Sequence, residues 1–313
     1  MRCANLFSLY SEKELRDVKT EGMFFAVGGN GASTQIYYSK DGISWSGNVS
    51  PGLNQELYSV TYGNGIYVAC GRHSGQGAIC YSYNGKKWYG PVAITTSTEL
   101  NAVAYGNGKF VAVKSSSEIY TSTDGKSWSE PITIDGLAVN IVNITFAIGK
   151  FVAVGNGGKV YYSYNGKLWS GPYVIGSNTM TGVTYGDDKF VVVDGQNNVF
   201  ISKNGISWTG PYSTGGSDTT LKITCGDKFY LIGDDNNNVF YSADGVSWTI
   251  VALTCNVANS VAYGNGIYLV GDQNGDIYYS YDCKNWKGPI SLTGATNITD
   301  IHYSNIDAAY PSP

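Results

Sequence analysis

The sequence predicts an all-β fold, a seven-bladed β-propeller made of four-stranded antiparallel blades. The main observation is a phrase, Ser-x-(Asp/Asn)-Gly-x-x-Trp, that occurs seven times and contains every tryptophan of the chain. Successive tryptophans are 38 to 43 residues apart, a period at which each repeat buries its apolar face only against its neighbours. The 26 tyrosines and 41 glycines among 313 residues suit pleated strands and tight turns.

Each copy of the phrase pairs one acid or amide with one tryptophan. The pairs are Asp41 with Trp45, Asn84 with Trp88, Asp124 with Trp128, Asn165 with Trp169, Asn204 with Trp208, Asp244 with Trp248, and Asp282 with Trp286. In the last copy Cys283 replaces the glycine. We expect the Asp or Asn side chain to accept backbone N–H groups of its own turn, the serine to add a second local hydrogen bond, and the tryptophan to pack between sheets. The phrase is therefore predicted to be structural.

The third repeat shows how one blade is built from four strands, named A to D in chain order. Asn-Gly and Asp-Gly pairs supply the positive φ angles that tight hairpin turns need. The predicted elements are strand A at 100–105, a turn at 106–108, strand B at 109–113, a loop at 114–117, strand C at 118–122, and strand D from Trp128.

The two ends of the chain predict how the ring closes. Residues 298–303 match the A strands of the other repeats, whereas the first repeat has only the imperfect segment 15–20 in that place. We therefore expect the C-terminal segment to supply or reinforce the inner strand of blade one. Residues 1–14 are predicted to be an N-terminal tail and residues 15–313 a single propeller.

Alternation of strand direction assigns the connections to two faces of the disc. The A–B and C–D turns lie on one face, called here the turn face, and the B–C loops and D–A connections lie on the other, the loop face. The repeated turns occupy the turn face, so we expect a site on the more variable loop face or in the central channel.

The composition of the chain argues against several classes of function. The net charge is −4 and only 3 arginines accompany 17 lysines, which argues against nucleic acid as a partner. No stretch approaches the roughly 20 apolar residues of a membrane span, so a soluble chain without membrane insertion is expected. The six cysteines (Cys3, Cys70, Cys80, Cys225, Cys255 and Cys283) lack zinc-ligand spacing. Cys70 and Cys80 fall on neighbouring strands and are either bridged or, as we favour, free thiols.

The repeated phrase resembles the Asp-box of sialidase-type, BNR-like propellers. It differs in two respects, because the spacing from acid to tryptophan is one residue shorter and because Asn replaces the acid in three copies. The resemblance implies a propeller and suggests a secreted, surface-associated or virion setting, as in bacterial secreted proteins and phage receptor-binding proteins. The resemblance does not imply sialidase activity, since Arg2, Arg16 and Arg72 cannot converge from three blades on a substrate carboxylate.

Several side chains are candidates for ligand contact, and none is predicted to be catalytic. Tyrosine occupies the second position of the phrase at Tyr83, Tyr164 and Tyr281, where its ring is expected to be exposed. Acids and amides fill the B–C loops of blades five to seven, among them Asp194, Asp234, Asp235, Asp272 and Asp276. Alternating oxygen ligands at Asp272, Asn274 and Asp276 make calcium the one cofactor considered. Tight loops without a ligand are also rich in Asp, Asn and Gly, so a purely structural role is the alternative.

The leading hypothesis is a non-enzymatic recognition or attachment propeller that binds a glycan or another cell-surface receptor, either alone or within a larger assembly. Tyrosine, asparagine and glycine are typical of such adaptable binding surfaces. The first alternative is a glycoside hydrolase that uses two loop carboxylates of blades five to seven. The second alternative is a scaffold that binds only protein. His73 and His302 lie near no predicted nucleophile, which disfavours nucleophilic catalysis.

Overall fold

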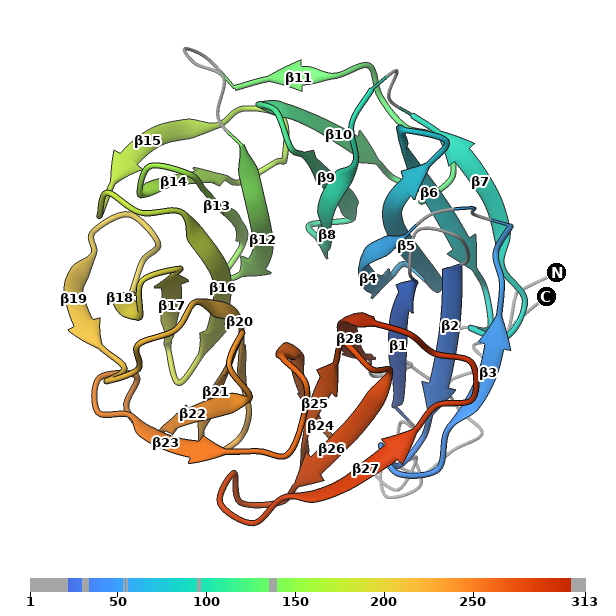
Figure 1. Cartoon of the computed structure of the whole chain (residues 1–313). Helices are drawn as coiled ribbons and strands as arrows, with labels where there is room; N and C mark the ends of the chain where they lie inside the picture. The colour runs from blue at the N-terminus through green and yellow to red at the C-terminus, as the bar shows by residue number, and fades with distance from the viewer. Residues whose placement is uncertain are drawn as a thin grey trace, which may run out of the picture.

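The computed structural model describes residues 22–29, 34–52, 54, 56–94, 97–134 and 140–304. These residues form seven four-stranded antiparallel sheets arranged around a central axis (Figure 1). The predicted all-β, seven-bladed propeller is confirmed. In this part of the chain no helix is long and apolar enough to cross a membrane.

Blades one to four follow the same order from the axis outward. Blade one consists of β28 (Ile298–Ser304), β1 (Met23–Gly29), β2 (Thr34–Ser39) and β3 (Ser46–Val49). Blade two consists of β4 (Leu57–Gly63), β5 (Ile66–His73), β6 (Gln76–Ser82) and β7 (Tyr89–Ala93). Blade three consists of β8 (Leu100–Gly106), β9 (Lys109–Lys114), β10 (Glu118–Ser122) and β11 (Ile132–Thr133). Blade four consists of β12 (Ile141–Ala147), β13 (Lys150–Gly155), β14 (Lys159–Ser163) and β15 (Ser170–Val174).

Blades five to seven complete the ring. Blade five consists of β16 (Met180–Gly186), β17 (Lys189–Asp194), β18 (Asn198–Ser202) and β19 (Thr209–Ser213). Blade six consists of β20 (Thr220–Cys225), β21 (Tyr230–Asp234), β22 (Asn238–Ser242) and β23 (Thr249–Ala252). Blade seven consists of β24 (Ala258–Gly264), β25 (Ile267–Asp272), β26 (Asp276–Ser280) and β27 (Lys287–Ser291).

The ring closes as predicted, because β28 from the C-terminal end pairs antiparallel with β1 (Figure 1). Ile298 and Ile301 of β28 are buried. The Thr299 hydroxyl hydrogen-bonds to the carbonyls of Val27 in blade one and Leu57 in blade two. Segment 15–20 and the predicted tail at 1–14 lie outside the described residues.

The predicted strands of blade three are confirmed for A, B and C, but strand D is shorter than expected. It begins at Ile132 and not at Trp128. Ser129 N donates to Thr121 O at 2.9 Å, and the pairing of β10 with β11 starts only at Ile132. Pro131 has no N–H to donate to the ladder, so the residues after Trp128 cross the blade without regular pairing. At the A–B turn, Asn107 and Gly108 have the expected positive φ angles, 48° and 72°.

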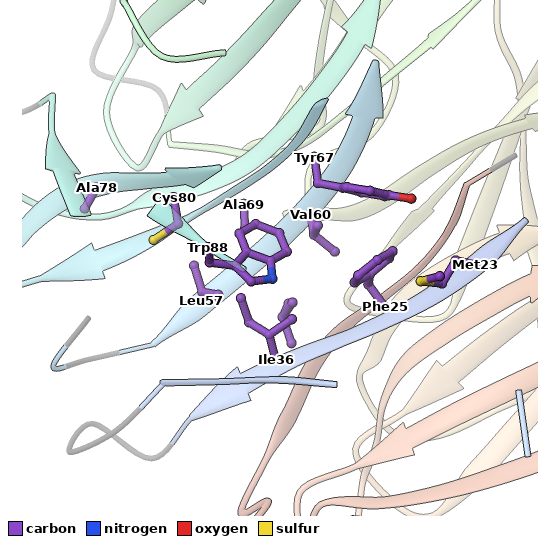
Figure 2. Packing of buried hydrophobic residues seen from close by; sticks show 11 residues of the cluster. Met23, Phe25, Ile36, Leu57, Val60, Tyr67, Ala69, Ala78, Cys80 and Trp88 are labelled. Atoms are coloured by element: carbon purple, nitrogen blue, oxygen red, sulfur yellow. The ribbon is translucent and has the colours of Figure 1, made fainter. Parts of the chain in front are cut away.

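The core lies in layers between neighbouring blades. Figure 2 shows the layer between blades one and two, where the Trp88 ring lies among Leu57, Ile36 and Ala69. The Trp88 ring also lies edge-on to Phe25, with the ring centroids 6.3 Å apart. The tryptophan of the repeated phrase therefore packs between sheets, as predicted.

Five cysteines belong to the described residues, and all five are free thiols. Cys70 lies opposite Ile79 and Cys80 lies opposite Ala69 in the β5–β6 pairing. Neighbouring positions along a strand point to opposite faces of the sheet, so the two sulfur atoms enter different core layers. Burial raises the pKa of both thiols well above the ordinary cysteine value, so both behave as small apolar side chains.

Candidate functional site

The repeated phrase folds into a turn that uses its own polar groups. In the third copy, Asp124 Oδ1 accepts the backbone N–H groups of Lys126 and Ser127, each at 2.8 Å. Ser122 Oγ accepts the Gly125 N–H at 2.8 Å and lies 3.0 Å from Asp124 Oδ1. Asparagine does the same in the second copy, where Asn84 Oδ1 accepts two backbone N–H groups at 2.9 and 3.0 Å. These Asp and Asn side chains stabilise turns.

The loop-face acids are also occupied by hydrogen bonds within the chain. Asp194, Asp234 and Asp272 end the B strands of blades five to seven and are buried. In each, Oδ1 accepts backbone N–H groups from the residues two and four positions later, at 2.7 to 3.0 Å. Their Oδ2 atoms accept further N–H groups, from the side chains of Asn198 and Asn238 and from the backbone of Asn256. The three acids hold the B–C loops in shape, and their role as ligand contacts stays a prediction.

The same hydrogen bonds decide how well the predicted calcium ligands fit a calcium ion. Both carboxylate oxygens of Asp272 accept N–H groups, and Asn274 Oδ1 accepts from the Asn256 side chain at 3.0 Å. A cation at Asp272, Asn274 and Asp276 would compete with these donors, so the donor set does not fit a calcium site well. Over the described ranges, no group of three or more His, Cys, Asp or Glu side chains is placed to hold a metal ion. Calcium binding stays a prediction.

The predicted tyrosines lie in exposed aromatic clusters on the turn face. In blade two, the rings of Tyr81 and Tyr89 stack with centroids 5.4 Å apart and planes 18° apart. Tyr83 lies edge-on to both rings, at 6.0 and 6.2 Å, and is 41% exposed. Lys126 of blade three donates from Nζ to the Tyr83 hydroxyl at 3.2 Å, and Lys87 Nζ lies 5.1 Å from the centre of the Tyr89 ring.

Blade four repeats this arrangement. The rings of Tyr162 and Tyr173 stack with centroids 5.7 Å apart, and Tyr164 lies edge-on to Tyr162 at 5.8 Å. Lys150 Nζ lies 5.5 and 5.1 Å from the centres of the Tyr162 and Tyr164 rings, and it donates to Asn204 O at 2.7 Å. The Tyr164 side chain is 56% exposed.

Blade seven has a smaller version, in which Tyr281 lies edge-on to Tyr279 at 6.1 Å. Lys287 Nζ lies 5.9 Å from the centre of the Tyr279 ring, and Tyr281 is 59% exposed. We call the three groups the tyrosine clusters: Tyr81, Tyr83 and Tyr89; Tyr162, Tyr164 and Tyr173; and Tyr279 with Tyr281. Each presents at least one exposed ring, and in blade two both Tyr83 and Tyr89 are exposed.

The central channel is a second candidate site, with a volume of about 350 Å³ and a lining of inner-strand residues. Asp300 of β28 is the one carboxylate among its described lining residues, and it accepts the Val60 N–H at 3.0 Å. Burial raises the pKa of Asp300 to about 6, an effect that the positive charge of Lys222 opposes. Burial lowers the pKa of His302 to about 4. The described lining of the channel therefore carries one acid, one amine and one imidazole.

Sequence reasoning missed parts of both sites. Tyr81, Tyr162 and Tyr279 lie on the C strands two residues before the predicted tyrosines, and that spacing places both side chains on the same face of the hairpin. This signal was available, whereas the contacts with Tyr89 and Tyr173 depend on the register of the outer strand. Asp300 and Lys222 both occupy the third position of an A strand, and alignment of the repeats would have shown that they share one level of the channel.

Comparison with known proteins supports the fold. No protein-family model and no curated protein matches the chain. Among solved structures, inactive virginiamycin B lyase from Staphylococcus aureus with quinupristin has a TM-score of 0.68 at 13% identity, covering 79% of this chain and 91% of the lyase. YCF48 bound to a D1 peptide has a TM-score of 0.62 at 13% identity, with 82% and 94% covered. The computationally designed protein Ika8 has a TM-score of 0.60 at 14% identity, with 88% and 86% covered.

The fold defines the class of this protein, a seven-bladed β-propeller. At identities of 13 to 14%, the likeness extends to the fold alone.

Proposed function

We propose that this propeller is a non-catalytic recognition module that binds glycans through the tyrosine clusters of its turn face. The observation that carries the proposal is the recurrence of one arrangement in blades two, four and seven: an exposed tyrosine ring, a second ring beside it and a lysine nearby. A ring held in place loses little conformational entropy when it binds. Its apolar face suits the C–H surface of a sugar, and its hydroxyl suits the sugar's polar edge.

The polar groups of the chain support a non-catalytic role. A glycoside hydrolase needs two carboxylates flanking the bond to be cleaved. The described lining of the channel contains one carboxylate, Asp300, and the acids at Asp194, Asp234 and Asp272 bind their own loops. Attachment to a cell-surface receptor, alone or as part of a larger assembly, is the role that we propose for such a module.

A protein partner is the second candidate, and one patch favours it. On the turn face of blade four, Ile148 and Leu168 are 51% and 78% exposed and accompany the exposed Tyr164. Asn107 of blade three connects the two turns that carry this patch, because its side chain donates to Gly149 O at 3.0 Å and to Tyr164 O at 2.9 Å. Exposed apolar side chains that lie together are typical of protein-binding surfaces.

A glycan array tests the proposal when it is screened with the wild-type chain and with the triple variant Y83A/Y164A/Y281A, each with and without calcium. The proposal expects saturable binding of the wild type to one sugar class and loss of that binding in the triple variant. The matched control is V174A/I250A, which shortens two exposed apolar side chains of outer strands that lie outside the tyrosine clusters. Binding that survives in the triple variant, or no sugar binding by the wild type, would refute the proposal.

A further inference from the structure

The charged side chains are divided between the two faces of the disc. Twelve of the fifteen lysines in the described part of the chain lie in, or directly beside, an A–B or C–D turn. These turn-face lysines are Lys40, Lys86, Lys87, Lys109, Lys126, Lys150, Lys167, Lys189, Lys203, Lys228, Lys284 and Lys287. The acids of the same turns and of the segments directly after them number eight: Asp41, Asp124, Glu130, Asp187, Asp188, Asp227, Asp244 and Asp282. The turn face therefore has a positive balance, although the whole chain is negative.

The loop face has the opposite balance. Its B–C loops and D–A connections carry three cations, Arg72, Lys114 and Lys159, in the described residues. They carry nine acids: Glu56, Glu99, Glu118, Asp194, Asp218, Asp234, Asp235, Asp272 and Asp276. The chain has a net charge of −4, yet its disc has one basic and one acidic face. Anionic ligands are attracted to the basic face.

The positive charge is least offset in the blades that carry the complete tyrosine clusters. In blades two and four the repeated phrase has Asn84 and Asn165 where four of the copies have an aspartate, and blade five, which also has an amide, carries Asp187 and Asp188 in its A–B turn. The amides accept the same two backbone N–H groups without adding a negative charge. The lysines of these two turns, Lys86, Lys87 and Lys167, are exposed. Positive charge and exposed aromatic rings therefore coincide.

We infer that the turn face binds an anionic polysaccharide, in which sugar rings stack on the tyrosine clusters and carboxylate or sulfate groups pair with the exposed lysines. This inference rests on the proposed function and names the ligand class of the same surface. The clusters of blades two and four are separated by blade three, whose C–D turn contributes Lys126 to Tyr83. A ligand that spans both clusters is therefore a chain of sugars. Linked contacts of this kind strengthen binding beyond that of one cluster.

A polysaccharide fits this surface better than a nucleic acid does. Proteins that bind phosphate backbones use arginine widely, because its planar guanidinium pairs with two phosphate oxygens. The one arginine of the described residues, Arg72, is the penultimate residue of the B strand of blade two, next to the acidic loop face. Lysines act as single point charges and suit isolated carboxylate or sulfate groups along a sugar chain.

The test compares charged and uncharged forms of the same sugars. The full chain is titrated with oligogalacturonate, a chondroitin sulfate oligosaccharide and oligosialic acid, each beside a neutralised counterpart, and with a single-stranded DNA oligomer of equal charge. We expect at least one anionic sugar to bind about tenfold more tightly than its neutral form, with an affinity that falls as salt rises. We expect K86Q/K87Q/K167Q to lose that preference but to keep its binding to neutral sugars.

A matched pair of variants in blade four separates local charge from total charge. Lys167 lies in the turn-face end of the blade and Lys159 at the start of β14 on the loop face. K167Q should weaken the anionic sugar severalfold and K159Q should leave its affinity unchanged. Equal binding of charged and neutral sugars would overturn this inference and leave the proposed function standing. If the wild-type chain binds no sugar at all, both this inference and the proposed function are overturned. If it binds DNA as tightly as it binds sugar, the assignment of a polysaccharide ligand is overturned.

Discussion

At the scale of single residues, the hydrogen bonds of the turn explain why either aspartate or asparagine can occupy the third position of the repeated phrase. The turn uses one side-chain oxygen that accepts two backbone N–H groups, and both residue types supply that oxygen. The sequence could predict this role because every partner lies within three residues. The functions of lysine and tyrosine at the neighbouring positions depend on other strands and blades, which local sequence does not show.

Substitutions at Asp124 test the role of the oxygen. Asp124→Ala removes the acceptor of two turn N–H groups, and we expect it to lower the free energy of unfolding by about 1–2 kcal/mol. Asp124→Asn keeps the acceptor and loses only the charge, so it should cost less than Asp124→Ala at pH 7. Urea denaturation measures both, with Asn84→Asp as the reverse exchange in blade two. If Asn were as damaging as Ala at position 124, the negative charge would matter and our account of the turn would be wrong.

The channel residues Asp300 and His302 should affect the pH dependence of stability in opposite directions. The pKa of Asp300 is raised in the folded state to about 6, so its contribution is present below about pH 4 and is lost as pH rises through 6. The pKa of His302 is lowered to about 4, so its contribution is present above about pH 6.5 and is lost as pH falls toward 4. Between these limits the two effects largely cancel.

Variants that remove one of the two groups should therefore show a pH dependence of stability that the wild type lacks. Relative to the wild type, Asp300→Asn should gain stability as pH rises from 4 to 6.5, because only the His302 contribution remains. His302→Gln should lose stability over the same range. Each change should be roughly 1–3 kcal/mol in urea denaturation measured at several pH values. Two variants with the wild-type pH profile would show that the channel does not shift the pKa values of these groups.

At the scale of elements, blades meet through positions where a side chain has no room. A methyl group added to Gly106 at the end of β8 would lie 2.0 Å from the Phe146 ring of blade four. From sequence, this glycine is predicted to belong to the A–B turn, since Gly-Asn-Gly is typical of turns. Its position is set by the approach of the next blade, and only the tertiary structure shows that requirement.

Two glycines of this one turn give a matched comparison. Gly106→Ala forces the Phe146 ring to move, and we expect it to lower the free energy of unfolding by about 2–3 kcal/mol. Gly108→Ala meets nothing within 4 Å but has a φ of 72°, so it should cost only about 1 kcal/mol. Urea denaturation separates the two. A smaller loss at Gly106 than at Gly108 would contradict the packing between blades three and four.

The loop acids show a limit of prediction at the same scale. From sequence, Asp194, Asp234 and Asp272 are ligand candidates, because acids in variable loops are typical of binding sites. The structure shows that their oxygens accept the N–H groups of their own hairpins. The repeated spacing Asp-x-Asn/Gln-x-Asn/Asp in three successive blades is the sequence signal of that structural role.

At the scale of the whole molecule, the sequence predicted the ring and its closure because both follow from the repeat. The match of residues 298–303 to the other A strands identified the strand that joins the two ends of the ring. The division of charge between the faces also follows from sequence once the turns are assigned. It requires each residue to be sorted by face, which net charge and composition do not do.

Closure can be tested by truncation. A chain that ends at Asn297 lacks β28 and exposes the inner edge of β1, together with the apolar surface that Ile298 and Ile301 cover. We expect this chain to lose its cooperative thermal transition in circular dichroism and to elute as an expanded or aggregated species. A control chain that ends at Ser304 keeps β28 and should unfold like the full chain. An unchanged midpoint without β28 would disprove closure by this strand.

Hydroxyl-radical footprinting with and without the best-binding sugar tests the central claim, that the turn face recognises glycans, most directly. The method oxidises exposed aromatic side chains, and Tyr83, Tyr164 and Tyr281 are 41%, 56% and 59% exposed. Our account predicts that the sugar protects these three tyrosines and leaves Ile250 of the outer strand β23 equally reactive. Protection of the channel residues or of the loop face, with the three tyrosines still reactive, would contradict it.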